Sequence, residues 1–118
     1  MSCFWQGLCN KVASLRNMPV SSVCCSLQGI NELTEGLMWN DQVVSQQQLQ
    51  ENFDWIQQYD CSRFDQGHDT SSCDPFLGLV SFAFNVNIIH DYAGHVSRFT
   101  MPGATQTITF VSSTSHFT

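Results

Sequence analysis

The stretch DPFLGLVSFAFNVNIIH, residues 74–90, joins two secondary-structure signals and decides the fold class. Asp74-Pro75 predicts the start of a helix, because proline fits the first helical turn. The apolar residues that follow recur at helical spacing and end near Asn85; they are Phe76, Leu79, Val80 and Phe84. Residues 86–89 (VNII) are rich in β-branched side chains and predict a strand. The sequence therefore predicts a helix that leads directly into a strand.

Two more strands are expected after this unit. Residues 95–100 form one candidate, and a tight turn follows at residues 101–103 (MPG), because proline and glycine favour turns. Residues 107–111 alternate between polar and apolar side chains, with Ile108 and Phe110 on one face. The second half of the chain therefore predicts a small β-sheet.

The first half of the chain is predicted to be helical. A first helix begins directly after Ser2 and Cys3, with Ser2 as a suitable cap, and it ends before Pro19, because the residue preceding a proline leaves the helical region. Its apolar residues recur at helical spacing; they are Phe4, Leu8, Val12 and Leu15. Cys9 lies on the same helix and is interpreted as a packing residue.

Two further helices and a loop precede residue 74. A second helix spans residues 20–28 and is closed by Gly29. A third covers about residues 45–59, and the polar residues 60–72 are expected to form a loop. The order of elements predicts one α+β domain, residues 1–118, in which N-terminal helices pack on a small C-terminal β-sheet.

Composition narrows the classes of function. The net charge is −6 and the chain has only four lysines and arginines, which argues against binding to nucleic acid or to anionic membranes. No stretch approaches the length of a membrane span, and the first residues, MSCFWQ, lack the features of a signal peptide. The six cysteines are therefore expected to be free thiols in a reducing compartment, with the cytosol as the default.

Cys3 is a candidate nucleophile because it lies at the start of a predicted helix. Unpaired backbone amides and the positive end of the helix dipole lower the pKa of a thiol there, and the thiolate is the reactive species. The same amides can hold a developing oxyanion. The competing interpretation is a buried free cysteine, which is common in intracellular proteins.

His116 is a candidate general base. It follows the strand at residues 107–111 and the polar turn at residues 112–115 (SSTS), a segment that could adjust the site when substrate binds. The competing interpretation is an exposed histidine near a frayed terminus.

Taken together, these blocks resemble the ovarian tumour (OTU) family of cysteine proteases. SCFW at residues 2–5 is similar to the family's cysteine block, and SHF at residues 115–117 to its histidine block. Residues 74–90 resemble the helix that enters the family's N-V-x-I strand. TITFV at residues 107–111 resembles the strand that leads to the catalytic histidine. The resemblance covers nearly the whole chain, and the small size is most like the viral OTU proteases of plant tymoviruses.

The resemblance implies a small OTU/papain-like fold and a deubiquitinase or endopeptidase without a metal or organic cofactor. Cys3 would be the nucleophile and His116 its base, with the backbone amides of Ser2 and Cys3 as the oxyanion hole. Trp5 and Ser115 would line the channel for the substrate's Gly-Gly tail. The expected partners are ubiquitin, a ubiquitin-like modifier and a viral polyprotein junction, and the expected location is the host cytoplasm.

The chain departs from the family pattern at two points. The acidic-glycine stretch that usually precedes the cysteine is absent, because the chain starts two residues before Cys3. Two residues after the histidine, where cellular members often have Asp or Asn, the chain has Thr118. The resemblance therefore implies a Cys3–His116 dyad, as in tymovirus-type enzymes, or a third group from elsewhere in the chain.

Other interpretations remain open. An OTU-like module that binds ubiquitin or a host protein without cleaving it would fit the same sequence. A zinc-stabilised interaction domain is another, with ligands drawn from Cys61, His68 and Cys73 together with Cys24 or Cys25, although this spacing lacks a Cys-x-x-Cys knuckle.

Two histidines and three tryptophans have simpler structural interpretations. His90 and His95 are rival bases, but both are interpreted as turn or hairpin residues. Trp5, Trp39 and Trp55 are interpreted as core or half-buried anchors, which is the alternative to a channel role for Trp5.

Overall fold

The computed structural model describes residues 3–66, 74–113 and 117, with only the backbone described for Cys3 and residues 64–66. The helices are α1 (Cys3–Lys11), α2 (Val20–Gly29), α3 (Gln46–Gln58) and α4 (Pro75–Phe84), with 3-10 helices η1 (Ala13–Leu15) and η2 (Cys61–Gln66). The strands are β1 (Met38–Trp39), β2 (Gln42–Val43), β3 (Asn87–Tyr92), β4 (His95–Thr100) and β5 (Thr107–Ser112). Within the described residues the chain is thus an α+β domain, as predicted.

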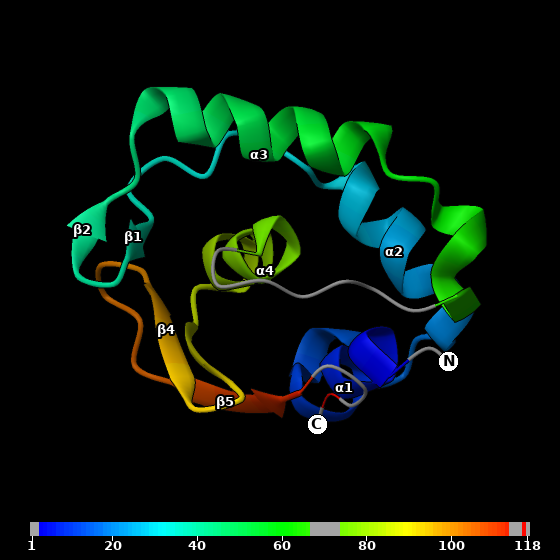
Figure 1. The fold of residues 1–118 in the computed structure, drawn as a ribbon. Coiled ribbons are helices and arrows are strands. Elements are labelled where there is room, and N and C mark those ends of the chain that lie inside the picture. The colour runs from blue at the N-terminus through cyan, green and yellow to red at the C-terminus, as the bar shows by residue number, and fades with distance from the viewer. Residues whose placement is uncertain (1–2, 67–73, 114–116, 118) are drawn as a thin grey trace.

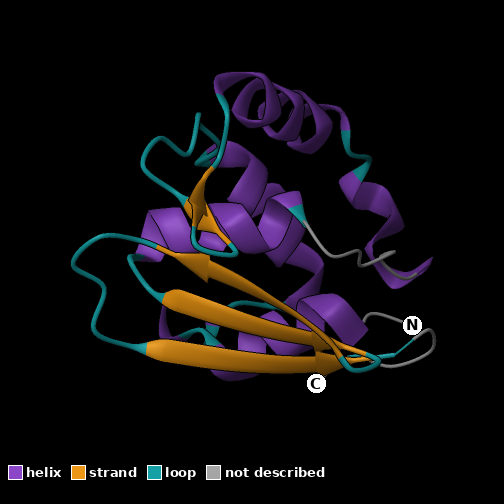
Figure 2. Cartoon of the chain, turned by 60° about the vertical axis from the view of Figure 1, so that its left-hand side comes forward, coloured by secondary structure: helices purple, strands orange, loops and turns teal. Residues whose placement is uncertain are grey.

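The strands form one mixed sheet in the order β2-β1-β4-β3-β5. β3 and β5 are parallel, and the other neighbouring strands are antiparallel. Figure 2 shows the three long strands side by side. β3 lies between β4 and β5, so both of its edges are hydrogen-bonded to neighbouring strands.

Helix α4 is the centre of the packing. Figure 1 shows it surrounded by α3, α2 and the sheet. Residues 76–81 are all buried, as expected for a helix that is apolar on every side. The Asp74 side chain accepts hydrogen bonds from the amides of Phe76 and Leu77 and so caps the helix, while Asn85 ends it in a left-handed conformation. The helix that the sequence predicts at this position is confirmed, and so is the strand that follows it.

The predictions for the other long elements hold with small changes. α2 and α3 match the expected helices, and the side chain of Ser45 caps α3. The first helix is shorter than expected, because it ends at Lys11 and continues as η1. No sequence pattern predicts β1 and β2, which are two residues each and are joined by a turn in which Asn40 and Asp41 have positive φ. Part of the expected loop 60–72 is η2.

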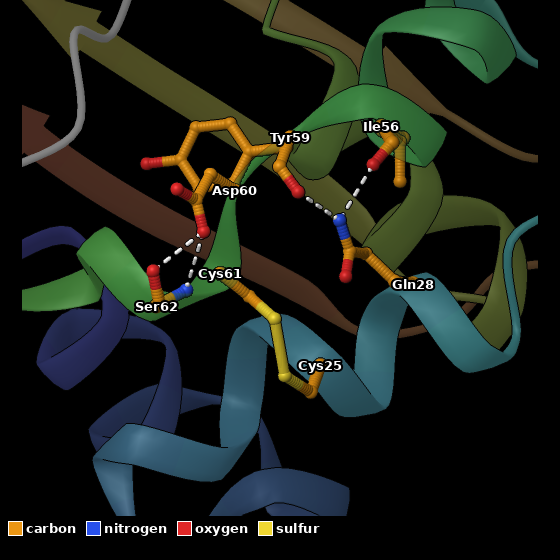
Figure 3. The surroundings of a disulfide bond; sticks show 7 residues. All are labelled: Cys25, Gln28, Ile56, Tyr59, Asp60, Cys61 and Ser62. Atoms are coloured by element: carbon orange, nitrogen blue, oxygen red, sulfur yellow. Dashed lines mark hydrogen bonds between the residues drawn. A yellow bond between two sulfur atoms is a disulfide. The ribbon is translucent and has the colours of Figure 1, made fainter.

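Cys25 and Cys61 form a disulfide, so the prediction that all six cysteines are free thiols is wrong for this pair. The two residues are 36 apart in sequence, and packing brings α2 beside η2 (Figure 3). The Nε2 of Gln28 reinforces this contact by donating to the carbonyls of Ile56 and Tyr59 at 2.9 Å and 2.5 Å. Because Cys25 and Cys61 are bonded, the cysteines of this chain no longer indicate a reducing compartment.

Candidate functional site

The backbone of Cys3 begins α1, as the sequence predicts. The structure does not describe the sulfur of Cys3. Four other residues of the expected site also lie outside the described residues: Ser2, Ser115, His116 and Thr118. What the structure describes is the immediate chain neighbour of each catalytic candidate: Phe4 follows Cys3, and Phe117 follows His116.

Phe117 is docked on α1 and on the end of the sheet. Its backbone forms an antiparallel bridge with Ser112, the last residue of β5. Its ring, which is only 6% exposed, lies 4.9 Å from the ring of Phe4 and stacks on Phe110 at 5.0 Å between centroids. The neighbours of Cys3 and His116, which are more than a hundred residues apart in sequence, are therefore in direct contact.

Gly7 makes this contact possible. A Cβ added to Gly7 would lie 2.7 Å from two ring carbons of Phe117, well inside van der Waals contact. Glycine in a helix costs about 1 kcal/mol relative to alanine, so its presence here has a packing reason. A glycine within a predicted apolar helix was the one sequence signal for this contact, and it did not identify the partner.

A second attachment joins α1 to β5. The Nζ of Lys11 donates a hydrogen bond to the carbonyl of Thr109 at 2.6 Å and lies 5.4 Å from the centre of the Phe110 ring. Figure 1 shows the end of β5 directed at α1. The two ends of the described chain are thus held together at several points.

His90 is a residue of the hairpin formed by β3 and β4, so its interpretation as a hairpin residue is confirmed, although it is buried in the strand and not in the turn. It is in the middle of β3 with no exposed surface, and its Nε2 is 2.6 Å from the hydroxyl of Ser112. Its ring centroid is 5.7 Å from that of Phe117. Burial lowers the pKa of His90, and Asp74 and Asp91 partly oppose that shift. His95, in contrast, is exposed at the start of β4, directly after the turn at Ala93-Gly94.

Trp5 is a core residue with no exposed surface. Its ring contacts Phe4 at 4.8 Å, Phe76 at 4.9 Å and Tyr59 at 5.9 Å between centroids. A side chain without exposed surface does not line a channel open to substrate, so the interpretation of Trp5 as a channel wall is replaced by the core-anchor interpretation. Of the other tryptophans, Trp39 is half-buried and Trp55 is 43% exposed.

The described free thiols are unsuited to nucleophilic chemistry. Cys9 and Cys24 are both buried. Burial raises the pKa of Cys9, and burial together with the charge of Asp60 raises the pKa of Cys24 to about 12. Both stay protonated at neutral pH, and Cys9 is confirmed as a packing residue of α1.

The zinc-domain interpretation loses two of its ligands. Cys25 and Cys61 are bonded to each other and have no thiolate to offer. His68 and Cys73 lie outside the described residues. Within residues 3–66, 74–113 and 117, no three His, Cys, Asp or Glu side chains are grouped so that they could hold a metal ion.

Comparisons with protein-family models, with curated proteins and with solved structures found no match to this chain. No helix in the described part of the chain has the length and apolar character needed to cross a membrane.

Proposed function

We propose that the chain is a cysteine protease of OTU type, with Cys3 as nucleophile and His116 as its general base. The observation that carries the proposal is the packing of Phe117 on Phe4 and Gly7. Consecutive Cα atoms are about 3.8 Å apart, so fixing Phe4 against Phe117 restricts how far apart their neighbours, Cys3 and His116, can lie. An apolar contact of this kind would orient the two side chains that do the chemistry.

The start of α1 supports the role of Cys3. The first amides of a helix have no partner within the helix, and the helix dipole favours a negative charge at this end. Both effects stabilise a thiolate on Cys3 and an oxyanion held by the amides of Ser2 and Cys3. The described free thiols, those of Cys9 and Cys24, have raised pKa values, so neither is suited to compete with Cys3 as the nucleophile.

The reaction follows from these roles. His116 takes the proton from Cys3, and the thiolate attacks the carbonyl carbon of the scissile bond. The amine leaves with a proton from His116, and a thioester joins the acyl group to Cys3. Water, deprotonated by His116, hydrolyses the thioester. The proposed substrates are (iso)peptide bonds after the C-terminal tail of ubiquitin or a ubiquitin-like modifier, and a viral polyprotein junction.

Turnover of a fluorogenic substrate attached to the C-terminus of ubiquitin tests the proposal. We expect turnover by the wild type and at least a thousandfold lower rate, an order-of-magnitude figure, for Cys3→Ser and for His116→Gln. Cys9→Ser is the matched control, because it removes a thiol from the same helix at a buried position. A folded wild type that binds ubiquitin without turnover would contradict the protease and favour the non-cleaving binding module.

A further inference from the structure

A polar pair is buried at the point where Phe117 packs on the end of the sheet. His90 has no exposed surface and Ser112 is 4% exposed, and the Nε2 and Oγ atoms are 2.6 Å apart. The surroundings are mainly aromatic, since the His90 ring lies 5.7 Å from Phe117 and 6.2 Å from Tyr92. Burying two polar side chains in such a place costs free energy unless their hydrogen bond is kept, so the pair specifies one arrangement of the strand end.

Ser112 connects His90 to Phe117, the described residue of the candidate site. Its carbonyl accepts a hydrogen bond from the amide of Ala93 at 2.9 Å, and its hydroxyl is bonded to His90. Its backbone also forms the bridge with Phe117. The side-chain contact with His90 therefore fixes the residue whose backbone pairs with Phe117.

The pair has a preferred protonation state. His90 Nδ1 is buried and has no hydrogen-bond partner in the described structure. A neutral His90 ring carries one N–H, so only the lone pair or the N–H of Nδ1 is buried without a partner. A charged ring carries an N–H on both nitrogens and must bury a positive charge as well. Burial lowers the pKa of His90 in agreement with this.

Few charges face the ring. Asp74 at the start of α4 and Asp91 on β3 raise the pKa of His90 but do not overcome burial. On β4 the residue paired with His90 is Ser97, which is uncharged, and on β5 it is Phe110. From α1, the Lys11 ammonium lies over the Phe110 ring. Among the described residues no acidic group is hydrogen-bonded to the ring, so Asp74 and Asp91 compensate a buried imidazolium only in part.

We propose that His90 is a positioning residue of the candidate site: as a neutral imidazole it holds Ser112, and through Ser112 it keeps Phe117, the residue that follows the candidate base His116, on α1. The role of His116 in this statement rests on the proposed function, whereas the control of Phe117 docking by His90 does not. Protonation of His90 is expected to release Phe117 from α1.

The experiment compares three substitutions with matched controls. His90→Leu removes the hydrogen bond and keeps an apolar filling, Ser112→Ala removes it from the other side, and His90→Gln keeps a bonding group near the Nε2 position without titration. His95→Gln on the exposed start of β4 and Ser97→Ala, buried on the same face, are the controls. Circular dichroism and thermal melts identify any variant that fails to fold, and Ser112→Ala then replaces His90→Leu.

The first readout is docking itself and needs no enzyme activity. Nuclear Overhauser contacts between the Phe117 ring and Gly7 or Phe4 are followed from about pH 8 to pH 5, the range in which a histidine titrates. We expect the contacts to weaken in His90→Leu and Ser112→Ala, and in the wild type on acidification. They should persist in acid in His90→Gln. Contacts that are unchanged by both substitutions, or lost equally in acid by His90→Gln, overturn the proposal whether or not the chain is a protease.

The second readout is the pH profile of ubiquitin-substrate turnover. A small displacement of a catalytic group lowers kcat by about tenfold to a hundredfold with a smaller effect on KM, which is the loss we expect for His90→Leu. His90→Gln should keep the neutral-pH rate and lose one ionisation from the acid limb. A profile of His90→Gln identical to the wild type contradicts the proposal, and a wild type without turnover contradicts the proposed function while the docking measurement still decides the role of His90.

Discussion

Two helical glycines allow close packing in this molecule, and they support different things. Gly78 in α4 lets Leu37 approach, since a Cβ there would lie 3.0 Å from a methyl carbon of Leu37. Gly7 in α1 lets Phe117 approach, with the corresponding distance 2.7 Å. The first contact is in the middle of the hydrophobic core, and the second joins the two ends of the chain at the candidate site. Stability and positioning are thus carried by separate contacts, and substitutions can separate them.

The largest effect is expected when a buried aromatic ring is truncated to alanine, either Phe76 in the core or Phe117 at the candidate site. Phe76→Ala removes a fully buried ring that packs on Trp5 and Tyr59, and it should lower the free energy of unfolding by about 3–5 kcal/mol. Phe117→Ala should cost less than Phe76→Ala, because Phe117 lies at the chain end, yet it should reduce ubiquitin-substrate turnover more per unit of stability lost. Denaturant unfolding and turnover measured on both variants check this. If Phe76→Ala and Phe117→Ala lost the same activity for the same loss of stability, Phe117 would have no separate positioning role.

The second largest effect is expected from removing the Cys25–Cys61 disulfide, which lies in the part of the molecule that we assign to stability. Closing a loop of 36 residues by the Cys25–Cys61 bond should stabilise the fold by about 4 kcal/mol in the loop-entropy model. Wild type with and without reductant, and the double variant Cys25→Ser with Cys61→Ser, are compared by denaturant unfolding. Because the bond joins α2 to η2, contacts of Phe117 with α1 should survive its loss. Loss of those contacts on reduction would show that the two regions are coupled.

Alanine at the two glycines is a smaller and sharper perturbation. Helix propensity alone would favour each alanine by about 1 kcal/mol. In Gly78→Ala we expect overpacking against Leu37 to outweigh this gain and to lower stability by about 1–2 kcal/mol with activity per folded molecule kept. In Gly7→Ala the change in stability should be smaller, because Phe117 can be displaced, and turnover should fall about tenfold or more. Wild-type turnover by Gly7→Ala would break the link between this contact and the site.

The smallest expected effect is the pH dependence of stability from His90. Its pKa is lowered in the folded protein, so between the folded pKa and the ordinary value of 6.5 the unfolded chain binds the proton and the folded chain does not. Stability from this group is complete above about pH 6.5 and is lost as the pH falls through the folded pKa, with a slope of at most about 1.4 kcal/mol per pH unit. Unfolding of the wild type and His90→Gln at several pH values should differ by this slope, whereas His95→Gln should follow the wild type.

Local patterns in the sequence were enough to predict the helices around α4 and the three long strands. Asp74, Pro75 and Asn85 mark the ends of α4 through short-range capping, and the alternation of Ile108 and Phe110 follows directly from strand geometry. These features depend on residues a few positions apart, so one sequence contains all the information that they need.

The features that the sequence did not reveal depend on distant pairs. The bond of Cys25 with Cys61, the contact of Gly7 with Phe117 and the burial of His90 each join segments that only the folded chain brings together. β1 and β2 were missed because two-residue strands have no periodicity, and β1 is held by its pairing with β4. The candidate residues Cys3 and His116 came from local blocks and a family resemblance, whereas the contact between their chain neighbours, Phe4 and Phe117, is non-local packing.

The proposed protease depends on Cys3 acting as a nucleophile that His116 activates. The most direct measurement is mass spectrometry of the protein after incubation with ubiquitin that carries a vinyl electrophile at its C-terminus. We predict a single covalent adduct, mapped to Cys3, that is retained in Cys9→Ser, absent in Cys3→Ser and formed much more slowly in His116→Gln. A folded wild type that forms no adduct, or an adduct on a cysteine other than Cys3, would contradict the account.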